Sequence, residues 1–98
     1  MVSIENSDLQ ADPDRPGVMV LTATLRNRAV FPQDYPALEL TLTNDLDQPL
    51  ARRVILPNQY LVAVPPEGFA ASSEKQVRLP LEAAGVQASG YRLYLFYP

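Results

Sequence analysis

Four aspartates in two turn-like segments are the first candidates for chemistry in this sequence. Asp12 and Asp14 lie in a segment rich in proline, and Asp45 and Asp47 follow an asparagine further along the chain. Calcium binds several oxygen ligands from loops, so these carboxylates could hold a cation. Their spacing does not match an EF-hand loop, and aspartate in such contexts is typical of turns. We interpret them as turn formers and predict no metal site.

Arg52 and Arg53 are adjacent and could clamp a phosphate or a carboxylate. Neighbouring residues of a β-strand point to opposite faces, so the two arginines should not form one basic patch. We expect one of them to be solvated and the other to contact a cross-strand or loop partner. The formal net charge is −3 and the other arginines are scattered, which argues against nucleic-acid binding.

The usual residues of nucleophilic and acid–base catalysis are scarce. The sequence has no cysteine and no histidine, which removes the thiolate nucleophile and the commonest general base near neutral pH. Ser72, Ser73 and Lys75 are close in sequence, but nothing near them would supply a base and an oxyanion site. Glu39 and Asp45 have no evident pocket. We predict a protein that is not an enzyme and has no catalytic, cofactor-binding or metal-binding residues.

Aromatic residues are concentrated at the end of the chain. Tyr91, Tyr94, Phe96 and Tyr97 could form a stacking platform for single-stranded nucleic acid or sugar. No basic groove accompanies them, so core packing is the preferred interpretation. The tyrosine hydroxyls would then need partners at the margin of the core, and Tyr91 could form a tyrosine corner.

The segment 89–98 is the densest run of large apolar side chains, and the other elements are expected to pack against it. Alternation puts bulky side chains on both faces: Tyr91, Leu93, Leu95 and Tyr97 on one, Arg92, Tyr94 and Phe96 on the other. We therefore predict a strand inside a sheet, with both faces at least partly covered, and not an exposed edge.

Five further strands are expected upstream, at 2–9, 18–28, 37–43, 50–56 and 72–82. The first is predicted to be marginal. In the third, Leu38, Leu40 and Leu42 should point inward. Pro80 lacks a ladder donor, which places the fifth at a sheet edge.

Two connections carry candidate core residues. Phe31 and Tyr35 are expected to anchor the loop 29–36. The segment 57–61 could form one helical turn that brings Tyr60 and Leu61 back to the core. With no longer helix, the pattern predicts an all-β sandwich with meander or Greek-key connections, as a single domain over 1–98. A small, partly open barrel is the alternative. No apolar run reaches the length of a membrane helix, and no signal peptide opens the chain.

Several segments together resemble an uncharacterised domain at the C-terminal end of bacterial proteins that begin with a zinc-ribbon finger and carry one membrane-spanning helix. The resemblance covers about 18–98 and rests on segments 24–27, 35–43, 51–54, 60–61, 89–93 and 96–98. The residues that we single out as its structural motif are Asn27, Pro36, Leu38, Arg53, Pro57, Tyr60, Gly90, Tyr91 and Tyr97. The domain looks similar to the FxLYD-type and LEA14-like (water-stress) domains.

This resemblance implies an immunoglobulin-like β-sandwich of about six to seven strands. It also implies an extracytoplasmic (periplasmic) domain of an inner-membrane protein, in which the finger and the membrane helix lie outside this chain. The membrane would then be reached only through that missing N-terminal helix. Arg53 and Tyr60 recur together in the resemblance, which suggests that the Arg53 guanidinium bonds to loop backbone. On that basis Arg53→Ala should destabilise the fold more than Arg52→Ala.

The expected role is non-catalytic: interaction or scaffolding, with a protein partner met through the loops or a sheet edge, at the first strand or the strand with Pro80. One alternative is a small-ligand or lipid-binding module, which would need an apolar cavity between the sheets. The other is a structural spacer with no unusual surface patch.

Overall fold

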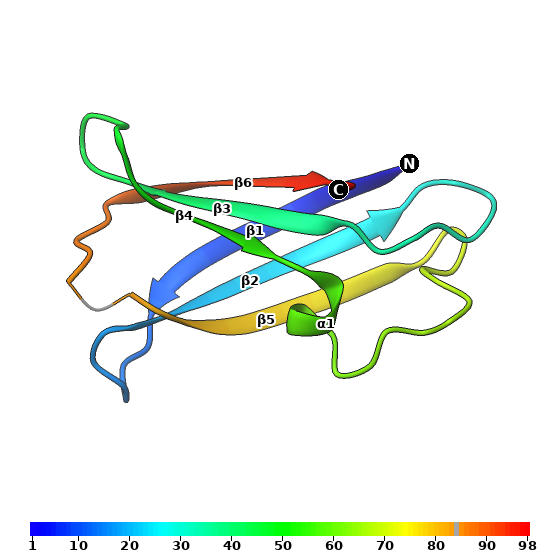
Figure 1. Cartoon of the computed structure of the whole chain (residues 1–98), viewed down its shortest axis with the longest axis horizontal. Helices are drawn as coiled ribbons and strands as arrows, with labels where there is room; N and C mark the ends of the chain where they lie inside the picture. Colours follow the sequence, from blue (N-terminus) through cyan, green and yellow to red (C-terminus); the bar gives the residue numbers. More distant parts are fainter. Residues whose placement is uncertain (84) are drawn as a thin grey trace.

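The computed structural model describes residues 1–83 and 85–98. In chain order, its elements are β1 (Val2–Ala11), β2 (Val18–Asn27), β3 (Ala37–Thr43), β4 (Pro49–Ile55), α1 (Pro57–Tyr60), β5 (Glu74–Glu82) and β6 (Gly90–Phe96). Two antiparallel three-stranded sheets, β1-β2-β5 and β4-β3-β6, form the two layers of a sandwich (Figure 1). This order corresponds to strands A-B-E and C′-C-F of the immunoglobulin fold, which confirms the predicted class. Within the described ranges, no helix has the length and apolar character that crossing a membrane requires.

The central strands β2 and β3 supply the middle of the core. Six of their inward residues are buried: Leu21, Ala23 and Leu25 on β2, and Leu38, Leu40 and Leu42 on β3. The alternating sequence pattern therefore predicted the inward faces correctly. Each fully buried leucine contributes about 1.5–3 kcal/mol relative to an exposed one, so these two strands dominate the packing energy.

The C-terminal strand β6 is extended as predicted, but its predicted position inside a sheet is wrong. It pairs with β3 on one side and is the outer strand of its sheet. Leu93 and Leu95 face the core and are half-buried, whereas Tyr94 on the other face is 58% exposed. Because both faces of this strand carry bulky side chains, we had expected both faces to be covered and the strand to lie inside a sheet. Instead β3, which is buried along nearly its whole length, occupies the central position.

The edge strands of the other sheet agree with the sequence. Within 1–83 and 85–98, β5 pairs only with β2, so Pro80 lies on an outer strand as predicted. β1 is also an outer strand, but it is not marginal, because it pairs with β2 along its length apart from one irregularity near Glu5. The cross-strand partners continue to Ala11, beyond the predicted end of this strand.

The loops at one end of the sandwich are packed around an aromatic cluster. The rings of Tyr35 and Phe69 stack with 4.7 Å between their centroids, and Tyr60 meets Tyr35 edge-on. The predicted helical turn is α1, and it buries Tyr60 together with Leu61. The anchor role predicted for Phe31 is wrong: this residue is 57% exposed, whereas Phe69, which was not predicted, is 1% exposed.

The two sheets meet along two lateral seams, one between the outer strands β1 and β6 and the other between the outer strands β4 and β5. These two seams differ. On one side β1 lies beside β6, and the Ser7 and Tyr91 hydroxyls share a hydrogen bond of 2.9 Å. On the other side, α1 fills part of the space between β4 and β5 by packing against β5 (Figure 1). The rest of that second seam is where the sandwich is open.

Candidate functional site

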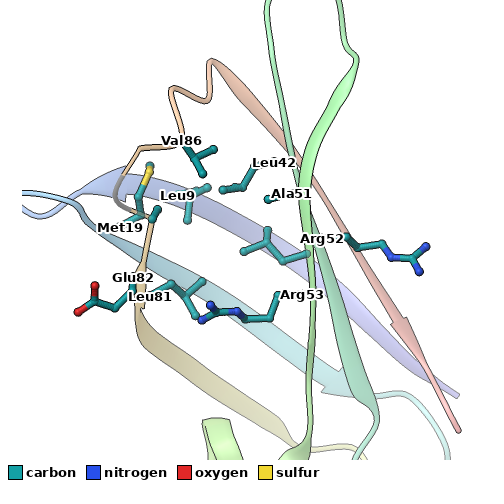
Figure 2. Close-up of a pocket in the computed structure, with 11 residues that line it drawn as sticks. Leu9, Met19, Leu42, Ala51, Arg52, Arg53, Leu81, Glu82 and Val86 are labelled. Atoms are coloured by element: carbon teal, nitrogen blue, oxygen red, sulfur yellow. The ribbon is translucent and has the colours of Figure 1, made fainter.

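An apolar hollow of about 110 Å³ lies in the open seam between β4 and β5 (Figure 2). Its apolar lining is Leu9, Met19, Leu40, Leu42, Ala51, Leu81, Ala83 and Val86. Charged residues border it as well: Arg52 and Arg53 from β4 and Glu82 at the end of β5. The hollow arises because β4 stands away from β5, so the side chains of the two sheets do not meet there.

β4 forms one wall of the hollow and is the most exposed strand of the sandwich. All of its residues except Ile55 are exposed. Among the described residues it pairs with β3 only, which leaves its other edge free. A bulge lies at its start, because Thr43 pairs with Pro49 and Leu42 with Ala51; from Ala51 to Ile55 the register is regular. This five-residue edge is therefore able to accept another strand by main-chain pairing.

The other free edges are less suited to an added strand. On β5, Pro80 pairs with Val20. A hydrogen-bonded antiparallel pair exchanges two N–H···O bonds, so Pro80 occupies the other kind of pair and its donorless nitrogen faces the free edge. On β1 the register is interrupted near Glu5. The β6 edge faces β1 across the closed seam (Figure 1).

The two arginines of β4 point in opposite directions, as alternation predicted (Figure 2). Arg52 lies on the outer face, 3.8 Å from the Glu39 carboxylate, which is a weak cross-strand pair. Arg53 reaches across the mouth of the hollow toward Leu81. The expected bond from its guanidinium to loop backbone is wrong, because Arg53 forms no side-chain hydrogen bond or ion pair with another described residue. Its charge is solvated and its stem covers apolar surface.

The bond expected for Arg53 is made by other members of the predicted motif. Tyr60 donates a buried hydrogen bond of 2.7 Å to the Pro36 carbonyl, and Tyr97 donates one of 3.0 Å to the Asp34 carbonyl. Pro57 is the first residue of α1, where its missing N–H costs nothing. Burial raises the pKa of the Tyr60 hydroxyl, and the nearby Tyr35 and Tyr97 hydroxyls add to the shift.

Asn27 is the polar residue most deeply integrated into the loops. It is fully buried at the end of β2. Its side-chain amide donates to the carbonyls of Phe31, Phe69 and Ala70 at 3.2, 2.9 and 3.2 Å, and its carbonyl oxygen accepts from the Ala29 N–H at 3.0 Å. One side chain thus joins the loop after β2 to the loop before β5, and its role is structural.

Leu38, Gly90 and Tyr91 of the predicted motif lie on the β3–β6 sheet. Leu38 is in the core opposite Leu95. A Cβ on Gly90 would lie 2.8 Å from Thr43 Oγ1, so a larger residue here would force the Thr43 side chain or the strands to shift. Tyr91 differs from a tyrosine corner: in the described structure its hydroxyl meets the Ser7 side chain of β1 instead of a backbone group.

The acidic turns behave as turn formers. Asp12 accepts from the Asp14 N–H at 2.9 Å and pairs with Arg15 at the same distance. The Asp14 N–H, followed by the Arg15 guanidinium, lowers the pKa of Asp12. Asp47 has φ of 59°, which closes the β3–β4 turn, and its carboxylate pairs with Arg92. These contacts assign turn roles to two of the four carboxylates, those of Asp12 and Asp47.

The aromatic residues of β6 do not form one platform. Tyr91 faces the core, Tyr94 lies on the outer face, and Tyr97 follows the end of the strand. The structure therefore does not bring together the stacking set considered from the sequence. It brings together instead the free β4 edge and the hollow. Sequence reasoning found the arginines of that site but not the hollow, because the separation of β4 from β5 leaves no local pattern.

Comparison with known proteins gives one match. No curated protein matches the chain, and no solved structure does. The sequence model of one family, described as "Protein of unknown function (DUF3426)", matches residues 1–95. This confirms the expected membership of an uncharacterised domain family and extends the match over β1, which the resemblance to 18–98 had left out. With almost the entire length matched, the chain belongs to the DUF3426 family of proteins of unknown function.

Proposed function

We propose that this chain is a non-catalytic protein-interaction domain that binds its partner at the free edge of β4. The observation that carries the proposal is the regular, exposed edge from Ala51 to Ile55 beside an apolar hollow. Edge strands that are left unprotected are ready templates for pairing with another chain. The sequence had pointed to the first strand or the strand with Pro80 for this role, and the geometry favours β4 over both.

The size of this hollow argues against a small ligand or lipid bound between the sheets at this position. Ligand sites are usually about 300–1,000 Å³. At about 110 Å³, this hollow offers far less room than a lipid chain needs. A single side chain from a protein partner suits it better. The spacer alternative predicts no surface of unusual character, which fits poorly with a free edge bordered by two arginines and apolar groups.

A site-specific crosslinking experiment tests the proposal. A photo-crosslinking amino acid replaces Val54 on the outer face of β4 in the protein expressed at its natural level in its own cells. The matched control carries it at Thr22, an exposed residue on the outer face of the opposite sheet. We expect discrete protein adducts from position 54 and none from position 22. Absence of adducts from position 54, or the same adducts from both positions, would contradict a partner at β4.

We further infer that the domain works outside the cytoplasm as part of a membrane-anchored protein, through the kinship to zinc-ribbon, FxLYD-type and LEA14-like proteins that the sequence suggested. A cysteine in place of Thr22 would test the location, because the chain contains no cysteine. Labelling by a membrane-impermeant maleimide in intact spheroplasts is expected, with the unsubstituted protein as control. Labelling only after lysis would refute the extracytoplasmic location.

A further inference from the structure

The residues of the β4 edge alternate in character as well as in direction. Ala51 and Arg53 pair with the buried Leu42 and Leu40, so they face the interior of the sandwich. Their neighbours Arg52 and Val54 pair with Thr41 and Glu39 on the outer face. Figure 2 shows the resulting divergence of the two arginines. An added strand would therefore meet an apolar and a basic residue on each face.

Cross-strand neighbours on one face of a sheet are stabilised when apolar groups meet apolar groups and opposite charges meet. A strand along 51–54 would therefore carry an apolar residue opposite Ala51, carboxylates opposite Arg52 and Arg53, and an apolar residue opposite Val54. Resting on the proposed function, we propose that the partner is an extended segment with the pattern apolar–acidic–acidic–apolar. The pattern reads the same in both directions, so it holds for parallel and antiparallel addition.

The hollow gives the inward apolar residue a place to anchor. The side chain opposite Ala51 would point between the sheets, where the hollow is lined by residues such as Leu42, Leu81 and Val86. Apolar cavities of about 150 Å³ accept a benzene molecule. The volume of about 110 Å³ in this seam thus suits one aliphatic side chain of valine, leucine or isoleucine size.

The charges around the site favour an acidic segment. Arg53 has no ion-pair partner among the described residues, and Arg52 has only the contact of 3.8 Å with Glu39. Glu82 also borders the hollow, but its carboxylate points away from Arg53 (Figure 2). Further along β5, Lys75 and Arg78 are exposed and basic, and the exposed Glu74 is already paired with Arg26. Two carboxylates would therefore meet two arginines that lack strong partners.

A second copy of this chain does not fit the site. The sequence contains no two adjacent acidic residues, so no segment of it provides the acidic pair. Antiparallel pairing of β4 with β4 would bring Arg52 and Arg53 close to the same residues of the other copy, and like charges opposite each other destabilise a sheet. The arginines thus oppose self-association and select a different, acidic protein.

Binding of short synthetic peptides tests this pattern. The probe is a capped eight-residue peptide with the core valine-glutamate-glutamate-valine flanked by threonine and serine. The matched control peptide has lysines in place of both glutamates. We expect the acidic peptide to shift the amide NMR signals of residues 51–55 and to bind at least tenfold more tightly than the lysine peptide, or about 1.4 kcal/mol.

Charge-reversal variants identify the residues responsible. The double variant Arg52→Glu/Arg53→Glu should lose the acidic peptide and gain the lysine peptide. The control Lys75→Glu/Arg78→Glu changes the net charge by the same amount on the other side of the seam and should keep the original preference. A thermal melt of each variant checks that the fold is retained. The same loss in both double variants would refute a role for the β4 arginines.

Failure of this inference differs from failure of the proposed function. A selection from a random peptide library adds the needed readout. Peptides that bind at residues 51–55 without enrichment of acidic pairs would overturn the acidic pattern and leave the β4 edge as a binding site. No binder at β4, together with no crosslinks from position 54 in cells, would overturn both.

Discussion

Replacing Asn27 by alanine is the sharpest test of what holds the loops of this fold. The substitution removes an amide that is fully buried and bonds to four backbone groups of two loops. The chain also offers a matched control in Asn44. That side chain also bonds to backbone groups, because it accepts from the N–H groups of Leu46 and Gln48, but it does so in an exposed hairpin turn.

Burial sets the difference between the two sites. A buried polar group that loses its partner costs about 1–3 kcal/mol, whereas a typical net hydrogen bond is worth about 0.5–1.5 kcal/mol. At Asn27, the Ala29 N–H at 3.0 Å and the Phe31 carbonyl at 3.2 Å would lose their partner, whereas the Phe69 carbonyl would still accept from the Gln33 N–H at 3.0 Å. We therefore expect Asn27→Ala to cost about 3–5 kcal/mol. Water can replace the partners at Asn44, so Asn44→Ala should cost about 1 kcal/mol.

Urea unfolding monitored by tyrosine fluorescence and circular dichroism measures both variants under one set of conditions. For a small domain the slope is about 1–3 kcal/mol per molar urea, so Asn27→Ala should lower the midpoint by roughly 1–5 M. The control should shift it by less than about 1 M. If the two variants lose the same free energy of unfolding, or if Asn27→Ala is the milder one, the assignment of Asn27 as the buried link between the loops is wrong.

Further substitutions test three other contacts. Gly90→Ala places a methyl group 2.8 Å from Thr43 Oγ1 and should cost about 1–3 kcal/mol in thermal unfolding; adding Thr43→Ala should recover part of the loss, and no recovery would contradict the clash. Tyr60→Phe removes a buried hydrogen bond to a loop carbonyl and should cost about 1–3 kcal/mol at pH 7. Burial raises the pKa of Tyr60 in the folded state, so the unfolded chain loses this proton first and the free energy of unfolding falls above about pH 10. The free energy of unfolding of Tyr60→Phe should therefore fall less steeply above that pH. An equally steep fall in the variant would refute the raised pKa. Leu38 lies on the central strand, and Leu38→Ala should cost about 2–5 kcal/mol in the same urea assay. Its half-buried partner Leu95 lies on the edge strand, so Leu95→Ala should cost clearly less. Equal costs would contradict the edge position of β6.

The arginine prediction changes with the structure. Because Arg53 has a solvated guanidinium and no bond to the described loop backbone, Arg53→Ala and Arg52→Ala should both cost less than about 1 kcal/mol. The effect of these residues is expected in partner binding and not in folding. Urea midpoints of the two single variants check this, and a loss at Arg53 that clearly exceeds the loss at Arg52 would restore the original expectation.

Side-chain alternation is a local property, so the amino-acid sequence was sufficient for the strands and their inward faces. Leu38, Leu40 and Leu42 point inward as predicted, and α1 forms at Pro57 where one helical turn was expected. The class of fold followed from the number and spacing of these strands. Alternation along a strand shows which of its residues share a face, and this inference does not require knowing which strands lie beside it.

Neighbours are a property of the assembled sheets, and the sequence did not define them. Bulk on both faces of β6 suggested a central strand, but β3 takes that place and leaves Tyr94 exposed. Phe69 is buried because two distant loops meet through its pairing with Gln33. The hollow beside β4 exists because that strand and β5 stand apart on one side of the sandwich. Such features depend on contacts between residues far apart in the chain, which no local pattern of side chains encodes.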